Sequence, residues 1–136
     1  MKLITRNTDY AIRALCCIAG HDGERVSAKR LVEILDMPRP FLRNILHALN
    51  NEGILYSFRG RGGGFALAKP TKKINLMHLM QIFQGNIRIN DCTFRKKVCP
   101  NIKECLLKKK LDIIEKEVIR NLGKITIYSL LEKKTV

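Results

Sequence analysis

Residues 27–68, SAKRLVEILDMPRPFLRNILHALNNEGILYSFRGRGGGFALA, decide the fold of this chain. Ser27 is a favourable N-cap, and the leucine and isoleucine residues after it recur at helical spacing, which predicts a short helix. A turn at residues 37–40 separates this helix from a second one. Pro40 suits the first turn of the second helix, and Gly53 suits the position just beyond its end. The sequence therefore predicts two short helices joined by a tight turn.

A glycine-rich hairpin is expected directly after the second helix. Residues 54–58 and 65–68 have the composition of two short strands, and the RGRGGG stretch between them contains Arg59, Arg61 and four glycines. Helix, turn, helix and basic hairpin, in this order, make up a winged helix-turn-helix. We therefore expect a mainly α fold with a two-stranded wing.

One further helix is expected before this unit and another after it. The first is capped by Asn7 or Thr8 and runs to about Gly20. It is apolar on nearly every side, which indicates one side in the core and the other against a partner subunit. The second is capped by Asn75 and ended by Gly85.

A long helix is expected from about Lys103 to Leu122, with Gly123 as its stop, and Thr126 caps a last short helix. The apolar stripe of the long helix is wider than one small domain needs to bury. The stripe comprises Leu107, Leu111, Ile114, Val118 and Leu122, widened by Leu106, Ile113 and Ile119. We expect three parts: a winged helix-turn-helix domain (1–85), a cysteine loop (86–106), and the long dimerisation helix with the last helix (103–136).

The chain carries a large positive charge, which restricts its function class. The chain has 26 lysines and arginines and 12 acidic residues, which gives a net charge of +14 in 136 residues. Such an excess in a small domain points to a polyanionic partner. No apolar run approaches the roughly 18 residues of a membrane span, and no signal-peptide pattern is recognised, so a cytoplasmic protein is expected. No nucleophile–base pair, phosphate-binding loop or carboxylate pair at recognisable spacing indicates an enzyme.

The second helix of the pair and the hairpin hold the candidate DNA contacts. The major groove admits an α-helix, where Arg43 suits a guanine edge and Asn44 an adenine edge. Arg59 or Arg61 suits a narrow minor groove, and the hairpin glycines allow close approach to the DNA backbone. Taken singly, each feature also fits a solvated helix face or an ordinary hairpin. The candidate DNA-binding residues are Ser27, Arg39, Pro40, Arg43, Asn44, His47, Arg59, Arg61 and Gly62.

Five cysteines fall into two groups. Cys16 and Cys17 lie in the apolar first helix, where we expect them in the core. Cys92, Cys99 and Cys105 lie close together in a polar stretch rich in lysine and arginine, whose charge favours the thiolate that metals require. Their spacing is unlike the paired cysteines of zinc fingers. These residues alone leave open a metal or cluster site, thiol redox chemistry, or no role.

Residues 37–85 resemble the core of the IscR/NsrR-type winged-helix regulators of bacteria. The family pattern is a Pro-containing turn, a helix with aromatic-Leu and Ile-Leu pairs, and then Ser-x-Arg-Gly-x-x-Gly-Gly-aromatic-x-Leu. The motif is matched here by Ser57, Arg59, Gly60, Gly63, Gly64, Phe65 and Leu67. The opening MKLITRNTDYAIRAL matches as well, so the resemblance covers nearly the whole chain. It implies a homodimer built on the long helix and a palindromic site on double-stranded DNA.

The resemblance also implies an iron–sulfur cluster on Cys92, Cys99 and Cys105, with [4Fe-4S] favoured over [2Fe-2S]. One branch of the family adds a histidine after the third cysteine, but this chain has LLKKK there. The NsrR-like branch instead adds an acidic residue from the first helix of the other subunit, and Asp9 occupies the matching position. A first-turn carboxylate that favours the helix dipole is the other interpretation of Asp9.

The expected function is thus a transcriptional regulator, by preference a repressor, that senses redox state, nitric oxide or iron through its cluster. The alternative is a metal-free regulator whose cysteines are oxidised directly.

Overall fold

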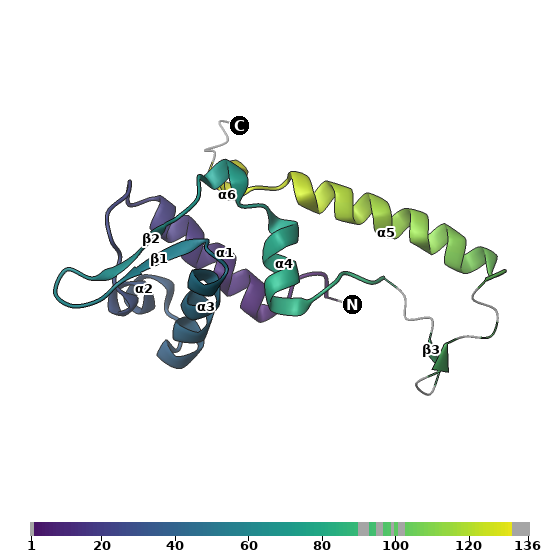
Figure 1. Cartoon of the computed structure of the whole chain (residues 1–136), viewed down its shortest axis with the longest axis horizontal. Coiled ribbons are helices and arrows are strands. Elements are labelled where there is room, and N and C mark those ends of the chain that lie inside the picture. The colour runs from purple at the N-terminus through teal and green to yellow at the C-terminus, as the bar shows by residue number, and fades with distance from the viewer. Residues whose placement is uncertain (1, 90–92, 95–96, 99, 101–102, 132–136) are drawn as a thin grey trace.

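The computed structural model describes residues 2–89, 93–94, 97–98, 100 and 103–131. Helices α1 to α4 and the β1–β2 hairpin gather into one head, from which the long α5 extends (Figure 1). This confirms a mainly α winged helix-turn-helix. The elements are α1 (Arg6–Ala19), α2 (Ala28–Leu35), α3 (Arg39–Asn51), β1 (Leu55–Phe58), β2 (Gly64–Leu67), the 3-10 turn η1 (Thr71–Lys73), α4 (Leu76–Gln84), β3 (Thr93–Phe94), β4 (Lys97–Val98), α5 (Leu106–Lys124) and α6 (Ile127–Leu131).

Helix α1 is the centre of the head and packs against α2, α3, β2, α4 and α6. Its buried apolar side chains share one core with the inner face of α3. That inner face consists of Leu42, Ile45, Leu46 and Leu49, as the apolar spacing predicted. The last helix, α6, also returns to this core, because Ile127 is buried in it and its N–H donates to the Ile74 carbonyl at 2.9 Å.

The helix starts follow the predicted caps in three cases and depart from them in one. Thr126 caps α6 as predicted, since its Oγ1 accepts the Ser129 N–H at 3.1 Å. The Ser27 hydroxyl accepts the Arg30 N–H at 3.1 Å at the start of α2. The Asn75 side chain does the same for α4. The cap of α1 is Thr5, so the expectation of Asn7 or Thr8 was wrong. Thr8 lies one turn further on and is fully buried. Its hydroxyl donates to the side chain of Gln84 in α4 at 2.8 Å instead of capping α1.

Helix α5 starts at Leu106, later than expected, and continues through Gly123 to Lys124. The predicted stop at Gly123 was wrong, because this glycine keeps helical backbone. The chain leaves the helix at Ile125, which is extended and whose carbonyl accepts the Leu76 N–H at 2.8 Å. Several apolar side chains of α5 stay open to solvent. The exposed fractions are 71% for Leu106, 63% for Leu107, 63% for Ile113 and 51% for Ile114.

The short strands β3 and β4 pair antiparallel, where the sequence predicted only an irregular polar loop. In the part of the chain that the structure describes, no helix is long and apolar enough to cross a membrane.

Candidate DNA interface and cysteine segment

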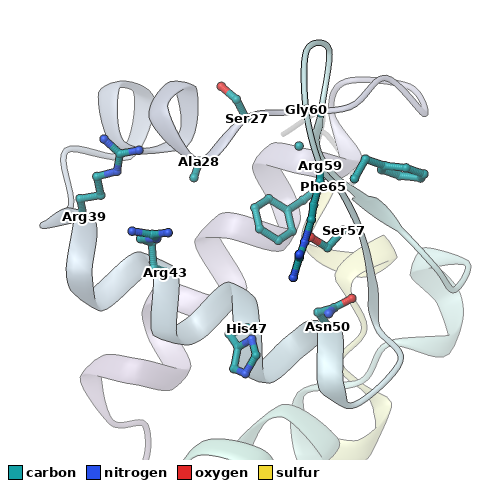
Figure 2. A pocket seen from close by; sticks show the side chains of 13 residues that line it. Ser27, Ala28, Arg39, Arg43, His47, Asn50, Ser57, Arg59, Gly60 and Phe65 are labelled. Atoms are coloured by element: carbon teal, nitrogen blue, oxygen red, sulfur yellow. The ribbon is translucent and has the colours of Figure 1, made fainter.

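A hollow of about 590 Å³ lies between α2, α3 and the wing, which we define as residues 55–67 (Figure 2). Three arginines line it, and none of its lining residues is acidic. It therefore offers a positively charged surface that a phosphate backbone can approach. The lining residues are Ser27, Ala28, Arg39, Arg43, His47, Asn50, Ser57, Phe58, Arg59, Gly60, Gly63, Gly64 and Phe65.

Helix α3 gives the hollow one stripe of polar side chains. Arg39, Arg43, His47 and Asn50 follow one another at spacings of four, four and three residues, which places them on one face of the helix. The sequence analysis missed Asn50, although this spacing alone could have identified it. Asn44 is exposed but is not among the lining residues.

The wing contributes a basic side chain to the hollow and a basic tip beyond it. Arg59 lines the hollow, as does Ser57 beside it (Figure 2). Ser57, like Asn50, was not among the predicted DNA-binding residues. Arg61 and Gly62 are exposed at the turn between the strands and do not line the hollow. The positive φ of Gly62, 71°, is one that glycine adopts without strain.

Two other glycines are required by the protein's own backbone. A Cβ on Gly64 would lie 2.6 Å from the Val26 carbonyl oxygen, and a Cβ on Gly63 would lie 2.3 Å from the Phe58 carbonyl oxygen. At this pair the absence of a Cβ is therefore needed inside the protein, whatever it adds to the approach to DNA. They let the hairpin close and let it approach the segment before α2, at Val26.

That close approach ties the wing to α2. The Val26 N–H donates to the Phe65 carbonyl at 2.9 Å, and the Phe65 N–H donates back at 2.8 Å. On the same connection the Arg25 guanidinium lies 3.7 Å from the centre of the Phe58 ring, a cation–π contact. The wing is thus held at a defined distance from Ser27 and from the start of α2.

Of the three candidate cluster cysteines, the structure describes Cys105, whereas Cys92 and Cys99 lie outside the described residues. Cys105 is the N-cap residue of α5, is half-buried, and has a free thiol. Among the described residues no group of three or more His, Cys, Asp or Glu side chains lies together.

Cys16 and Cys17 pack against the core of the head, as predicted. Burial raises the pKa of both thiols; the neighbouring Cys17 adds to the effect at Cys16, and Arg30 opposes it at Cys17. Asp9 is in the first turn of α1, and its carboxylate accepts the Arg13 Nε–H at 3.0 Å.

Comparison with known proteins identifies the family. The model of the Rrf2 family, described as "Iron-dependent Transcriptional regulator", matches residues 4–133. The chain belongs to the Rrf2 family. Rrf2 proteins are DNA-binding transcriptional regulators and not enzymes, which agrees with the absence of catalytic patterns in the sequence.

Relatives of this Rrf2 chain cover nearly its whole length. The HTH-type transcriptional regulator NsrR of Bacillus subtilis is 29% identical over 136 residues, which is 98% of this chain and 92% of the relative. The structure of T. potens IscR has a TM-score of 0.73 at 22% identity, over 96% of this chain and 86% of that one. The oxidised form of Staphylococcus aureus CymR has a TM-score of 0.75 at 22% identity, over 100% of both chains. These two structures share the fold of this chain.

Proposed function

We propose that this Rrf2 regulator is a repressor that binds a palindromic operator as a homodimer, with α3 in the major groove and the wing tip in the minor groove. The observation that carries the proposal is the hollow between α2, α3 and the wing. Helix α3 and the wing supply its arginines, and no acidic residue lines it. A groove about 12 Å wide admits a helix such as α3.

Within this arrangement the chain's residues have different tasks. Arg43 and His47 lie in the middle of the α3 stripe and are the side chains placed to reach base edges. Arg39, near the start of α3, and Ser27 are placed for phosphates. The Ser27 oxygen already accepts the Arg30 N–H, so its hydroxyl hydrogen remains available to donate to a phosphate oxygen.

The homodimer is proposed from the surface of α5. Leu106, Leu107, Ile113 and Ile114 are each more than half exposed, so about half of the wide stripe has no cover within this chain. A contiguous exposed apolar surface of this kind favours an interface. A second copy of α5 offers the same side chains, and a two-fold axis places two reading heads on the two half-sites of a palindrome.

The proposed sensor is an iron–sulfur cluster held by Cys92, Cys99 and Cys105, with Asp9 of the other subunit as fourth ligand. The description of the family as iron-dependent supports it. The described part of the donor set fits, since Cys105 has a free thiol and the Asp9 carboxylate is 46% exposed. Such a cluster supplies a centre that reacts with oxygen or nitric oxide. The ion pair between Arg13 and Asp9 occupies one oxygen of the Asp9 carboxylate, so Asp9 would bind the cluster while still paired with Arg13 or would give up that pair.

A metal-free thiol sensor is the second candidate, and one observation favours it. A protein of the same fold, CymR of Staphylococcus aureus, has been crystallised in an oxidised form. In that case Cys92, Cys99 or Cys105 would change DNA binding through direct oxidation.

DNA binding is tested with a duplex that the wild-type protein enriches from a random-sequence pool. If each subunit neutralises about three to four phosphates, a plot of log affinity against log salt should have a slope on the order of −5 to −7. A slope near zero contradicts the proposal.

The sensor is tested by anaerobic purification with a visible spectrum and an iron and sulfide assay. We expect serine at Cys92, Cys99 or Cys105 to abolish visible absorbance and bound iron, and serine at Cys16 or Cys17 to leave both intact. Colourless, iron-free wild type that still responds to oxidants would favour the thiol sensor.

Asp9 has a separate test. Asp9→Ala should allow assembly but change the lifetime of the cluster or its reaction with nitric oxide; wild-type values for both contradict the Asp9 assignment alone. A heterodimer with Asp9→Ala on one chain and Cys99→Ala on the other then tests ligation between subunits. Cross-subunit ligation puts both lesions on one site and leaves the other intact, whereas ligation within a subunit damages both.

A further inference from the structure

The side chain of Gln84, the last residue of α4, joins the start of the chain to the point where the cysteine segment, residues 86–105, departs. Its Oε1 accepts the Thr8 hydroxyl at 2.8 Å and the Thr5 N–H at 3.1 Å. Its Nε2 donates to the Leu3 carbonyl at 2.9 Å. One amide therefore fixes three positions around the first turn of α1.

The Thr8 contact matters because it lies inside the protein. Thr8 is 0% exposed with Gln84 in place, and its hydroxyl donates to Gln84 Oε1 at 2.8 Å and lies 3.2 Å from the hydroxyl oxygen of Thr5, the cap of α1. Hydrogen bonds to a buried hydroxyl are costly to lose, and loss of Gln84 leaves Thr8 with the longer contact to Thr5 alone, which gives the Gln84 contact a preferred geometry. Thr8 belongs to α1, which packs against α2, α3 and β2. A displacement at Thr8 consequently reaches the elements that surround the DNA-facing hollow.

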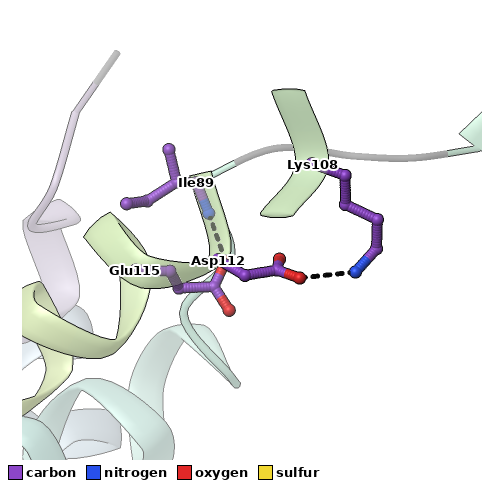
Figure 3. Close-up of polar contacts among 4 residues, drawn as sticks. All are labelled: Ile89, Lys108, Asp112 and Glu115. Carbon is purple, nitrogen blue, oxygen red and sulfur yellow. Dashed lines mark hydrogen bonds and ion pairs between the residues drawn. The ribbon is translucent and has the colours of Figure 1, made fainter. Parts of the chain in front are cut away.

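The chain beyond Gln84 is anchored a second time, on α5. Gly85 turns the chain with a φ of 76°, and Ile87 packs against the small core around Met80 and Leu122. The Ile89 N–H then donates to Glu115 Oε2 at 3.0 Å, one helical turn from the Lys108–Asp112 ion pair (Figure 3). Four residues, 85–88, thus separate an anchor on the head from an anchor on α5, and the packing of Ile87 holds the middle of this short connection.

We propose that Gln84 is the positioning residue through which a change in the cysteine segment alters DNA binding. The inference rests on the proposed function, because it needs a segment that senses and a head that binds DNA. A change that moves residue 89 along α5 displaces Gln84 through the short connection. Gln84 then shifts or releases the first turn of α1, and the head changes its geometry.

The test measures DNA affinity in two states of the cysteines. The probe is the enriched duplex, and the states are anaerobically purified protein and protein alkylated with iodoacetamide. Burial raises the pKa of Cys16 and Cys17, so these thiols react more slowly, and mass spectrometry reports which cysteines are modified. The readout is the ratio of the two affinities, which a merely structural role of Gln84 would leave unchanged.

Three variants make the test specific. Gln84→Met keeps the side-chain length but removes all three hydrogen bonds. Thr8→Val keeps the shape and removes one hydroxyl, and it decides the question if Gln84→Met does not fold. Gln81→Met is the matched control, because Gln81 lies on the same helix with an exposed side chain. Faster hydrogen exchange of the Thr5 amide in Gln84→Met checks that its bond to Gln84 is lost.

In wild type and in Gln81→Met we expect the two states to differ in affinity by about 5- to 150-fold, the usual range of coupling between sites. In Gln84→Met and Thr8→Val we expect the ratio to fall towards one. A wild-type ratio in Gln84→Met, or in Thr8→Val when Gln84→Met is unfolded, overturns the role of Gln84 and leaves the proposed function intact. A wild type that binds DNA equally in both states overturns the sensing function and this inference together.

Discussion

Replacing Gly64 with alanine should damage the wing, although Gly64 offers no side chain to DNA. The backbone of Gly64 has a φ of 145°, and a Cβ there would lie 2.6 Å from the Val26 carbonyl oxygen and 2.7 Å from its carbon. Both neighbours are backbone atoms, so no flexible side chain can move aside. The wing has to shift away from Val26, in the segment before α2.

Two costs add up for Gly64→Ala. A non-glycine residue in such a backbone region costs about 1–3 kcal/mol. A shift of the wing also breaks the two Val26–Phe65 hydrogen bonds of 2.9 and 2.8 Å, each worth a net 0.5–1.5 kcal/mol or so. We therefore expect a loss of about 2–6 kcal/mol in the free energy of unfolding. DNA affinity should fall as well, because Arg59 and Ser57 line the hollow from the displaced wing.

Urea denaturation followed by circular dichroism measures the first effect, and titration of the enriched duplex measures the second. Gly62→Ala is the matched control: its φ is 71°, but nothing lies within 4 Å of its added Cβ, so only the backbone term of about 1–2 kcal/mol applies. If Gly64→Ala is no less stable than Gly62→Ala, the contact between the wing and Val26 does not hold the wing as described.

Three further results are expected. Ile114 is 51% exposed, and Ile114→Asp should place a charge in the apolar surface of α5 and give monomers or aggregates in analytical ultracentrifugation. Lys116→Asp, on the polar side of the helix, should leave the dimer intact. If Ile114→Asp still forms a folded dimer, α5 is not the interface. Arg43→Ala and His47→Ala should relax operator preference in competition binding, by roughly 1–3 kcal/mol for a good base contact, and an unchanged preference in both would mean that α3 is not the reading helix. Arg61→Ala should weaken binding to all DNA sequences alike and reduce the slope of log affinity against log salt by about 1. Unchanged affinity and slope would mean that the wing tip does not contact the DNA.

Local signals in the sequence were sufficient for the elements of the head. Ser27 and Asn75 cap the helices that were predicted for them, and Pro40 lies in the first turn of α3. These positions are decided by hydrogen bonds and backbone preferences within three or four residues, so the neighbouring sequence is sufficient to predict them. The same locality explains the error at Gly123. Glycine inside a helix costs only about 0.5–1 kcal/mol relative to alanine, and here the chain leaves the helix at Ile125, whose carbonyl accepts the N–H of the distant Leu76.

The sequence by itself determined the order of helices and the wing, the positive charge, and a set of basic side chains that included Arg39, Arg43 and Arg59. Only the tertiary structure decided that these three arginines share one hollow with Asn50 and Ser57, and that Gly64 has to lack a Cβ because the Val26 backbone lies against it. It also decided that Thr8 is buried against Gln84, 76 residues away, instead of capping α1. The reason is that such contacts join residues far apart in the chain, and neither helical periodicity nor a capping preference carries information about a distant partner.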